Sequence, residues 1–177
     1  MFLLESEQLI LLALDFESLS LLKSDRVLLE KHLALDFTGH KVSPEIQIEI
    51  KRDLRCRIQE VYENAVDYLW YTSWEIILKV KNQSVGAIGL TGISDENGET
   101  MLGYYIDERN RNNGFASEAI KTLTKWAFLN KKLIQINAYT QNNNISSQKV
   151  LQKNGFILAG NDEDLMHWKL KRNTKNK

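Results

Sequence analysis

In Tyr104-Tyr-Ile-Asp-Glu-Arg-Asn-Arg-Asn-Asn-Gly-Phe-Ala-Ser-Glu-Ala119, a predicted strand passes into a predicted helix through a short polar loop. Residues 103–106 are apolar and aromatic, which is typical of an extended strand. Residues 107–113 contain no core-forming side chain. From Ala116 onward, apolar side chains recur at intervals of three and four, so one face of the helix is apolar. We therefore expect the rest of the chain to be organised around this strand–loop–helix unit.

The polar loop has the composition of an anion-binding turn. The first backbone N–H groups of a helix have no intrahelical partner and carry the positive end of the helix dipole. Asn112, Asn113 and Gly114 are small or tolerate positive φ, so successive N–H groups can point toward one anion. Arg111 adds a full positive charge beside them. A pyrophosphate group fits such a loop, although an ordinary strand-to-helix connection capped by asparagine has the same composition.

Several segments resemble one enzyme superfamily. Arg111-Asn-Asn-Gly-Phe-Ala116 is similar to the Arg/Gln-x-x-Gly-x-Gly/Ala signature of the GNAT superfamily of acyl-CoA-dependent N-acetyltransferases. Residues 102–107 and 115–120 resemble the strand before that signature and the helix after it. Asn144-Ile-Ser-Ser-Gln-Lys-Val-Leu-Gln-Lys-Asn-Gly-Phe156 resembles the second signature of the branch that acetylates the N-termini of ribosomal proteins. Residues 5–11 also look like the first strand of that branch, so the motifs occur in the expected order.

The length of 177 residues favours a single domain, which we expect at residues 1–171, followed by a basic tail at residues 172–177. The resemblance covers nearly the whole chain and is poorest between residues 35 and 74. Strands are expected at residues 9–14, 74–80, 85–93, 99–106, 133–139, 156–159 and 165–170. Helices are expected at residues 16–22, 25–35, 44–68, 116–127 and 144–154. The expected fold class is α/β (α+β), with a GNAT-like, mixed, mostly antiparallel twisted sheet of about seven strands flanked by helices.

Composition narrows the classes of partner. The net charge is zero, so nothing indicates a nucleic-acid or membrane surface. The single cysteine, Cys56, excludes an internal disulfide. No apolar run is long enough for a membrane span and no secretory signal is visible, so we expect a cytoplasmic protein. No histidine pair has metal-ligand spacing, so no metal is expected; a homodimer is compatible with the sequence.

The resemblance implies acetyl-CoA as the co-substrate. Its phosphates and adjoining groups are expected to contact Arg111, Asn112, Asn113, Gly114, Phe115, Ala116 and Asn144. The backbone at Tyr105 and Ile106 is expected to pair with the pantetheine amides and to polarise the thioester. The strands that carry Tyr105 and Asn137 are expected to separate and admit the pantetheine arm. Asn112 stands where the family usually has glycine, but asparagine tolerates left-handed backbone, so we expect the loop to form.

Acetyl transfer to an amine needs a group that takes the amine proton and can use one that protonates the leaving thiolate. Leu151 stands where many family members have an acid tyrosine. Ser147 matches the serine proposed as the acid in the ribosomal-protein branch; alternatively, its hydroxyl bonds to backbone in a first helical turn. Met101 stands where that branch often has a glutamate. Glu99 lies two residues earlier on the same strand face and is the candidate base; a solvated carboxylate at a turn edge is the alternative.

These patterns predict an acetyl-CoA-dependent N-acetyltransferase that transfers the acetyl group directly to a primary amine. No acyl-enzyme nucleophile is evident, because Cys56 has no histidine near it in the sequence. An N-terminal amine with a pKa of about 7.8 is neutral in roughly a quarter of molecules at pH 7.4, against about one in a thousand for lysine. A chain without a clear base therefore suits a protein N-terminal α-amine or a small amine. The alternatives are a non-catalytic acyl-CoA-binding sensor module and an unrelated nucleotide-phosphate binder.

Overall fold

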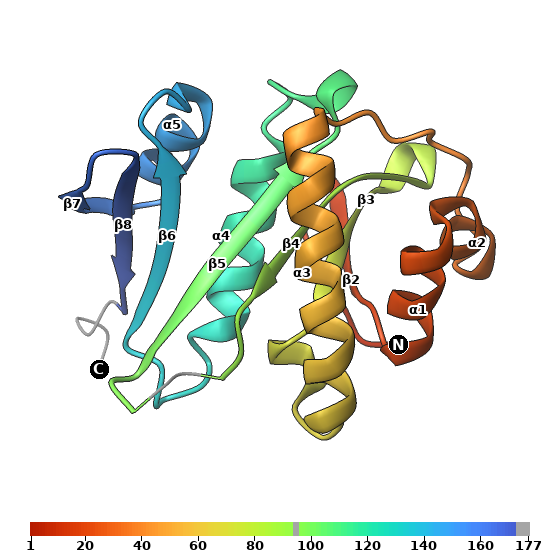
Figure 1. The fold of residues 1–177 in the computed structure, drawn as a ribbon, viewed down its shortest axis with the longest axis horizontal. Helices are drawn as coiled ribbons and strands as arrows, with labels where there is room; N and C mark the ends of the chain where they lie inside the picture. The colour runs from red at the N-terminus through yellow and green to blue at the C-terminus, as the bar shows by residue number, and fades with distance from the viewer. Residues whose placement is uncertain (94–95, 173–177) are drawn as a thin grey trace.

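The computed structural model describes residues 1–93 and 96–172 (Figure 1). Of the predicted basic tail, only Arg172 is among these residues, and residues 173–177 lie outside them. The Arg172 backbone N–H donates to the carbonyl oxygen of Ile134 at 2.9 Å. Its guanidinium Nε donates to the carbonyl oxygen of Leu133 at 2.8 Å, so Arg172 contacts the folded domain directly.

Within the described residues, eight strands form one sheet in the order β1-β2-β3-β4-β5-β6-β8-β7. The strands are β1 (Leu3–Glu5), β2 (Leu9–Ala13), β3 (Ser73–Leu78), β4 (Gln83–Leu90), β5 (Glu99–Ile106), β6 (Gln135–Gln141), β7 (Ile157–Asn161) and β8 (Leu165–Lys171). Only the pair β5–β6 is parallel among the paired strands of this described sheet. The predicted mixed, mostly antiparallel sheet is confirmed. The additional strand is β1, which lies at the edge and is only three residues long.

Five α-helices accompany the sheet in the described part of the chain: α1 (Phe16–Ser24), α2 (Arg26–His32), α3 (Pro44–Glu63), α4 (Phe115–Ala127) and α5 (Ile145–Lys153). The predicted start of α3 is confirmed, because Ser43 Oγ accepts from the backbone N–H of Ile46 at 3.4 Å and Pro44 opens the first turn. The predicted end near Tyr68 is wrong. The helix ends at Glu63, and the chain turns into a short 3-10 helix at Tyr68–Trp70.

The helices cover both faces of the sheet, with α3 in front and α4 behind in Figure 1. Apolar residues of β2, β3 and β4 form the main core with the buried face of α4, which carries Ala119, Ile120 and Leu123. A second cluster lies among the N-terminal helices and contains Leu14, Leu19, Leu29, Leu54 and Val61. Burial of aliphatic side chains contributes about 1.5–3 kcal/mol each, so both clusters stabilise the frame around the cleft described below.

The strands β5 and β6 pair over a short distance and then separate. Their parallel register covers three pairs, from Glu99 opposite Gln135 to Met101 opposite Asn137. Beyond Met101, β5 continues to Ile106 along β4, whereas β6 continues along β8 (Figure 1). The separation that the family resemblance implied is therefore present. Among residues 1–93 and 96–172, no strand pairs with this edge of β5 from Leu102 onward.

Candidate active site

A cleft of about 1430 Å³ occupies the opening between β5 and β6. The loop before α4 and the helix α5 line it, and residues of α3 line it as well. Gly103 lines its floor, and a Cβ atom built there would meet no atom within 4 Å. The cleft exceeds the volume of about 300–1,000 Å³ that is common for small-molecule sites, so it can hold a long ligand.

The loop between β5 and α4 has the predicted backbone conformation. Asn112 has φ 63° and Gly114 has φ 82°, so both are left-handed. The Asn113 side chain donates to the carbonyl oxygens of Asn110 at 3.2 Å and Arg111 at 3.0 Å, which holds the turn. Gly114 supplies no side-chain cap, and the first turn of α4 lines the cleft. The N–H groups of that turn therefore lie where an anion in the cleft can reach them.

A buried carboxylate supports this loop from behind. Asp107 accepts hydrogen bonds from the backbone N–H of Lys41 at 2.7 Å and from that of Arg109 at 2.9 Å. The Arg109 guanidinium donates to Asp107 Oδ2 at 2.7 Å and to the carbonyl oxygens of Thr38 and Gly39. Burial opposes the charge of Asp107, but these donors outweigh it and hold the pKa of Asp107 well below its ordinary value.

The start of α5 forms the opposite wall. Asn144 Oδ1 accepts from the backbone N–H of Ser147 at 3.1 Å, so the predicted cap is confirmed, and Gly155 is left-handed with φ 82°, as expected at C′. This bond orients the Asn144 oxygen toward the helix, although the residue lines the cleft. Ser147 is half-buried and lines the cleft as well, while Leu151 is buried there and offers no proton.

Tyr104 is a further hydroxyl that the sequence reasoning missed. Its Oη atom is buried and has no hydrogen-bond partner of good geometry among the described residues. Burial raises the pKa of Tyr104, and the side chain of Ser147 opposes this rise. The alternation of strand residues was the available signal, because Tyr104 must point to the face opposite Tyr105.

The Tyr105 side chain belongs to a buried polar network. Arg26 donates to Glu75 Oε1 at 2.6 Å and to Tyr105 Oη at 3.1 Å. Ser84 donates to the same Glu75 oxygen, and His40 Nε2 lies 3.0 Å from Ser84 Oγ. Burial raises the pKa of Tyr105, and burial together with Arg26 lowers that of His40. The Tyr105 hydroxyl therefore contacts Arg26, while the residue also lines the cleft.

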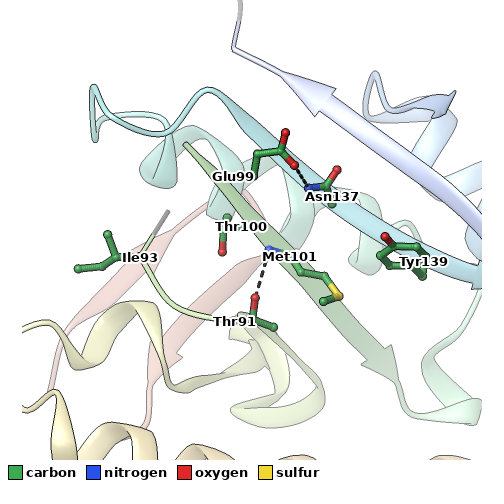
Figure 2. A pocket seen from close by; sticks show the side chains of 7 residues that line it. All are labelled: Thr91, Ile93, Glu99, Thr100, Met101, Asn137 and Tyr139. Carbon is green, nitrogen blue, oxygen red and sulfur yellow. Dashed lines mark hydrogen bonds between the residues drawn. The ribbon is translucent and has the colours of Figure 1, made fainter. Parts of the chain in front are cut away.

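Figure 2 shows a smaller pocket of about 240 Å³ next to the cleft. Its lining residues are Thr91, Ile93, Glu99, Thr100, Met101, Asn137 and Tyr139. Three of them, Thr91, Met101 and Tyr139, also line the cleft, so the two spaces adjoin. Glu99 Oε2 accepts a hydrogen bond from Asn137 Nδ2 at 2.8 Å (Figure 2). The pocket therefore places a carboxylate beside the point where the strands separate.

The two predicted catalytic residues therefore line different cavities. Ser147 lines the cleft and Glu99 lines the adjoining pocket. The predicted cofactor loop also lines the cleft. Among residues 1–93 and 96–172, no cluster of three or more His, Cys, Asp or Glu side chains could hold a metal ion.

No helix in the described part of the chain has the length and apolar composition needed to cross a membrane.

Known proteins share both sequence and fold with this chain. An uncharacterized N-acetyltransferase of Bacillus subtilis (strain 168), YjdG, is 35% identical over 98 residues, which cover 55% of this chain and 58% of that protein. The uncharacterized N-acetyltransferase p20 of Bacillus licheniformis is 32% identical over 87 residues, 49% of each chain. The matches thus span about half the length of these relatives.

Solved structures extend the fold similarity to the whole chain. RimL, a ribosomal L7/L12 alpha-N-protein acetyltransferase in complex with coenzyme A, superimposes with a TM-score of 0.67 at 17% identity, covering 96% of this chain and 98% of RimL. The ribosomal-protein-S5-alanine acetyltransferase of Vibrio fischeri gives 0.68 at 16% identity and covers 100% of both chains. At sequence identities of 17% and 16%, this structural similarity shows a shared fold and no more. Residues 13–157 match the acetyltransferase (GNAT) domain family, and because that match covers most of the chain, the chain belongs to the GNAT acetyltransferases.

Proposed function

We propose that this protein is an acetyl-CoA-dependent N-acetyltransferase that passes the acetyl group directly to a primary amine. The acceptor is the α-amine of a protein N-terminus or a small amine. One observation carries the proposal: the opening between β5 and β6 joins an anion-binding loop at one end to a pocket with a carboxylate at the other. A thioester carrier with a charged diphosphate fits the anion-binding loop, and a cationic amine fits the pocket with the carboxylate.

The cofactor would lie along the separated edge of β5. In the described part of the chain, no strand pairs with that edge beyond Met101, and backbone N–H and C=O groups need hydrogen-bond partners. The two amides of a pantetheine arm can supply them in the manner of an added strand. The diphosphate then reaches Arg111 and the N–H groups around residues 112–116 at the start of α4.

The reaction would run through a ternary complex. The Glu99 carboxylate takes one proton from the ammonium form of the acceptor, which frees the nitrogen lone pair. The nitrogen attacks the thioester carbonyl carbon, a C–N bond forms and the C–S bond breaks. The leaving sulfur gains a proton from the Ser147 hydroxyl, and the second proton, which leaves the nitrogen as the amide forms, passes through solvent to restore that hydroxyl. Glu99 then releases its proton to solvent, so the products are the acetylated amine, free thiol and one proton.

The acceptor class follows from the pocket. A volume of 240 Å³ equals that of about eight water molecules, which suffices for an amino group and the atoms next to it. Solved structures with this fold include enzymes named for acting on the N-termini of ribosomal proteins, which supports an N-terminal α-amine.

The cytoplasmic location, the domain at residues 1–171 and a homodimer stay predictions.

The proposal is tested by incubating the purified protein with acetyl-CoA and a panel of amines. The panel contains peptides with free N-termini, matched peptides with blocked N-termini and a free lysine, and small polyamines. We expect thiol release and an acetylated product with at least one free amine. Calorimetric binding of CoA without thiol release from any amine would instead favour a sensor module. Binding of ATP as tight as that of CoA would favour a general nucleotide-phosphate binder.

A further inference from the structure

The side chain of Asn137 is held on three sides. Its Nδ2 donates to Glu99 Oε2 at 2.8 Å (Figure 2). Its Oδ1 accepts from Gln135 Nε2 at 3.0 Å and lies 2.9 Å from His167 Nε2. Glu99 and Asn137 belong to β5 and β6, and His167 belongs to β8. The contacts therefore connect three strands beneath the small pocket.

The chemistry of these groups fixes the direction of every hydrogen bond. A carboxylate only accepts, so Asn137 must turn its NH₂ group toward Glu99 and its oxygen toward His167. The oxygen only accepts as well, so His167 Nε2 must carry a hydrogen atom. In its neutral form, His167 is consequently the Nε2–H tautomer. The ring is also held in place by Tyr139, which stacks on it with centroids 4.8 Å apart and planes 11° apart.

The geometry points to Asn137 and His167 as positioning residues that hold the Glu99 carboxylate toward the acceptor amine. This inference rests on the proposed function, because it assigns their task in that reaction. A charge-assisted bond from Asn137 keeps one carboxylate oxygen in a fixed place, and His167 keeps the Asn137 amide from rotating. Proton transfer depends on such placement, because the base must lie within hydrogen-bond reach of the amine. Neither residue needs to touch the substrate.

A matched pair of variants at His167 separates the hydrogen bond from the ring stacking. H167F keeps a ring against Tyr139 but removes the donor to Asn137. H167Q loses the ring but keeps an N–H donor of similar reach. We expect kcat of H167F to fall at least about fivefold and that of H167Q to stay within about twofold of the native value, with KM for acetyl-CoA unchanged in both. A stacking role alone would reverse the order of the two variants.

A double-mutant cycle tests whether Asn137 acts through Glu99. N137L replaces the amide with an apolar side chain of the same branching, and E99Q removes the base. We expect kcat to fall about a hundredfold or more in E99Q and about tenfold in N137L. The double variant should be no slower than E99Q, because a positioning residue has nothing left to position. Losses that multiply in the double variant would overturn the inference, while the native turnover would still support the proposed function.

The tautomer gives a readout that does not depend on activity. The protein has three histidines, so the ¹⁵N signals of His167 can be assigned by comparing the native protein with H167Q. We expect the Nε2–H pattern for His167 in the native protein and a shifted Nε2 signal in N137L, where the hydrogen bond to Asn137 is lost. An Nδ1–H pattern in the native protein would overturn the inference even if N137L fails to fold. Absence of thiol release from the native protein with every amine would instead overturn the proposed function.

Discussion

Gly103 leaves an open position in the middle of β5, where most strands carry a side chain. A Cβ atom there would meet nothing within 4 Å, so the free protein tolerates a larger residue. We predict that G103V keeps or slightly raises stability, because glycine costs about 0.5–1 kcal/mol in a strand. The valine would nevertheless occupy the cleft floor, and we expect kcat/KM for acetyl-CoA to fall at least about tenfold.

Gly160 provides the matched control for this substitution. It lies in the edge strand β7, also has no atom within 4 Å of an added Cβ, and does not line the cleft. Thermal unfolding and thiol-release kinetics of G103V and G160V should agree in stability and differ in activity. Equal activity of the two variants would show that no ligand passes over Gly103.

Ser147 permits a separate test of the leaving-group acid. The Asn144 cap uses the backbone N–H of Ser147, so S147A keeps this bond and the start of α5. We expect a fall in kcat of about tenfold, which is less than a full general-acid effect because a CoA thiolate leaves readily. Pre-steady-state thiol release measures the step directly. An unchanged rate in S147A, with Tyr104 intact, would assign the proton to Tyr104 or to water.

At the scale of elements, Asp107 joins the segment before α3 to the loop before α4. It is fully buried and bonds to the backbone of Lys41 and to Arg109, which in turn bonds to Thr38 and Gly39. Its folded pKa lies below its unfolded value of about 3.9. The stability that it contributes is therefore complete above about pH 4 and decreases as the pH falls through that value toward the folded pKa.

We predict that D107N lowers the free energy of unfolding by about 1–3 kcal/mol at pH 7, because it removes a charged acceptor from buried donors. The difference between D107N and the native protein should shrink as the pH decreases below 4. Urea denaturation at a series of pH values measures both curves. A difference that stays constant down to pH 2 would contradict the linkage argument.

The sequence predicted those elements whose signals are local. Ser43, Asn144 and the loop at Asn112–Gly114 adopt the expected conformations, because caps and left-handed turns depend on a few neighbouring residues. The three-residue strand β1 has too few residues for a period to show. The apolar period of α3 continues past Glu63 to Ala65 and Leu69, so it does not mark the helix end. The separation of β5 and β6 followed from family resemblance, since periodicity carries no information on strand neighbours.

Most polar contacts between side chains of the site could not be predicted from the sequence. Arg26, Glu75 and Tyr105 meet from three elements that lie far apart in the sequence. The same holds for Asn137 and His167, whose bond joins β6 to β8. Such contacts depend on sheet register, and a shift of one residue would turn each side chain to the other face. The strand β6 was in fact predicted two residues too early, at 133–139 instead of 135–141.

At the scale of the whole molecule, a ligand between β5 and β6 contacts both parts of the sheet. It should therefore stabilise the protein as a unit. If CoA binds only the folded state, a concentration 100 times its Kd adds about 2.7 kcal/mol to the free energy of unfolding. We expect a single thermal transition that moves upward with CoA concentration, measured by scanning calorimetry. ATP at the same concentration is the control, and an equal shift with ATP would argue against recognition of the pantetheine arm.

The short ladder between β5 and β6 has a consequence for backbone amide exchange with deuterated water. Three residue pairs join the strands at one end, and beyond Met101 no strand of the described residues pairs with the edge of β5 that faces the opening. The amides on that edge should exchange quickly, although they belong to a central strand whose opposite edge pairs with β4 over residues 102–106. A bound cofactor should slow the exchange of these amides selectively. Their exchange rates would therefore report, residue by residue, whether the cleft is occupied.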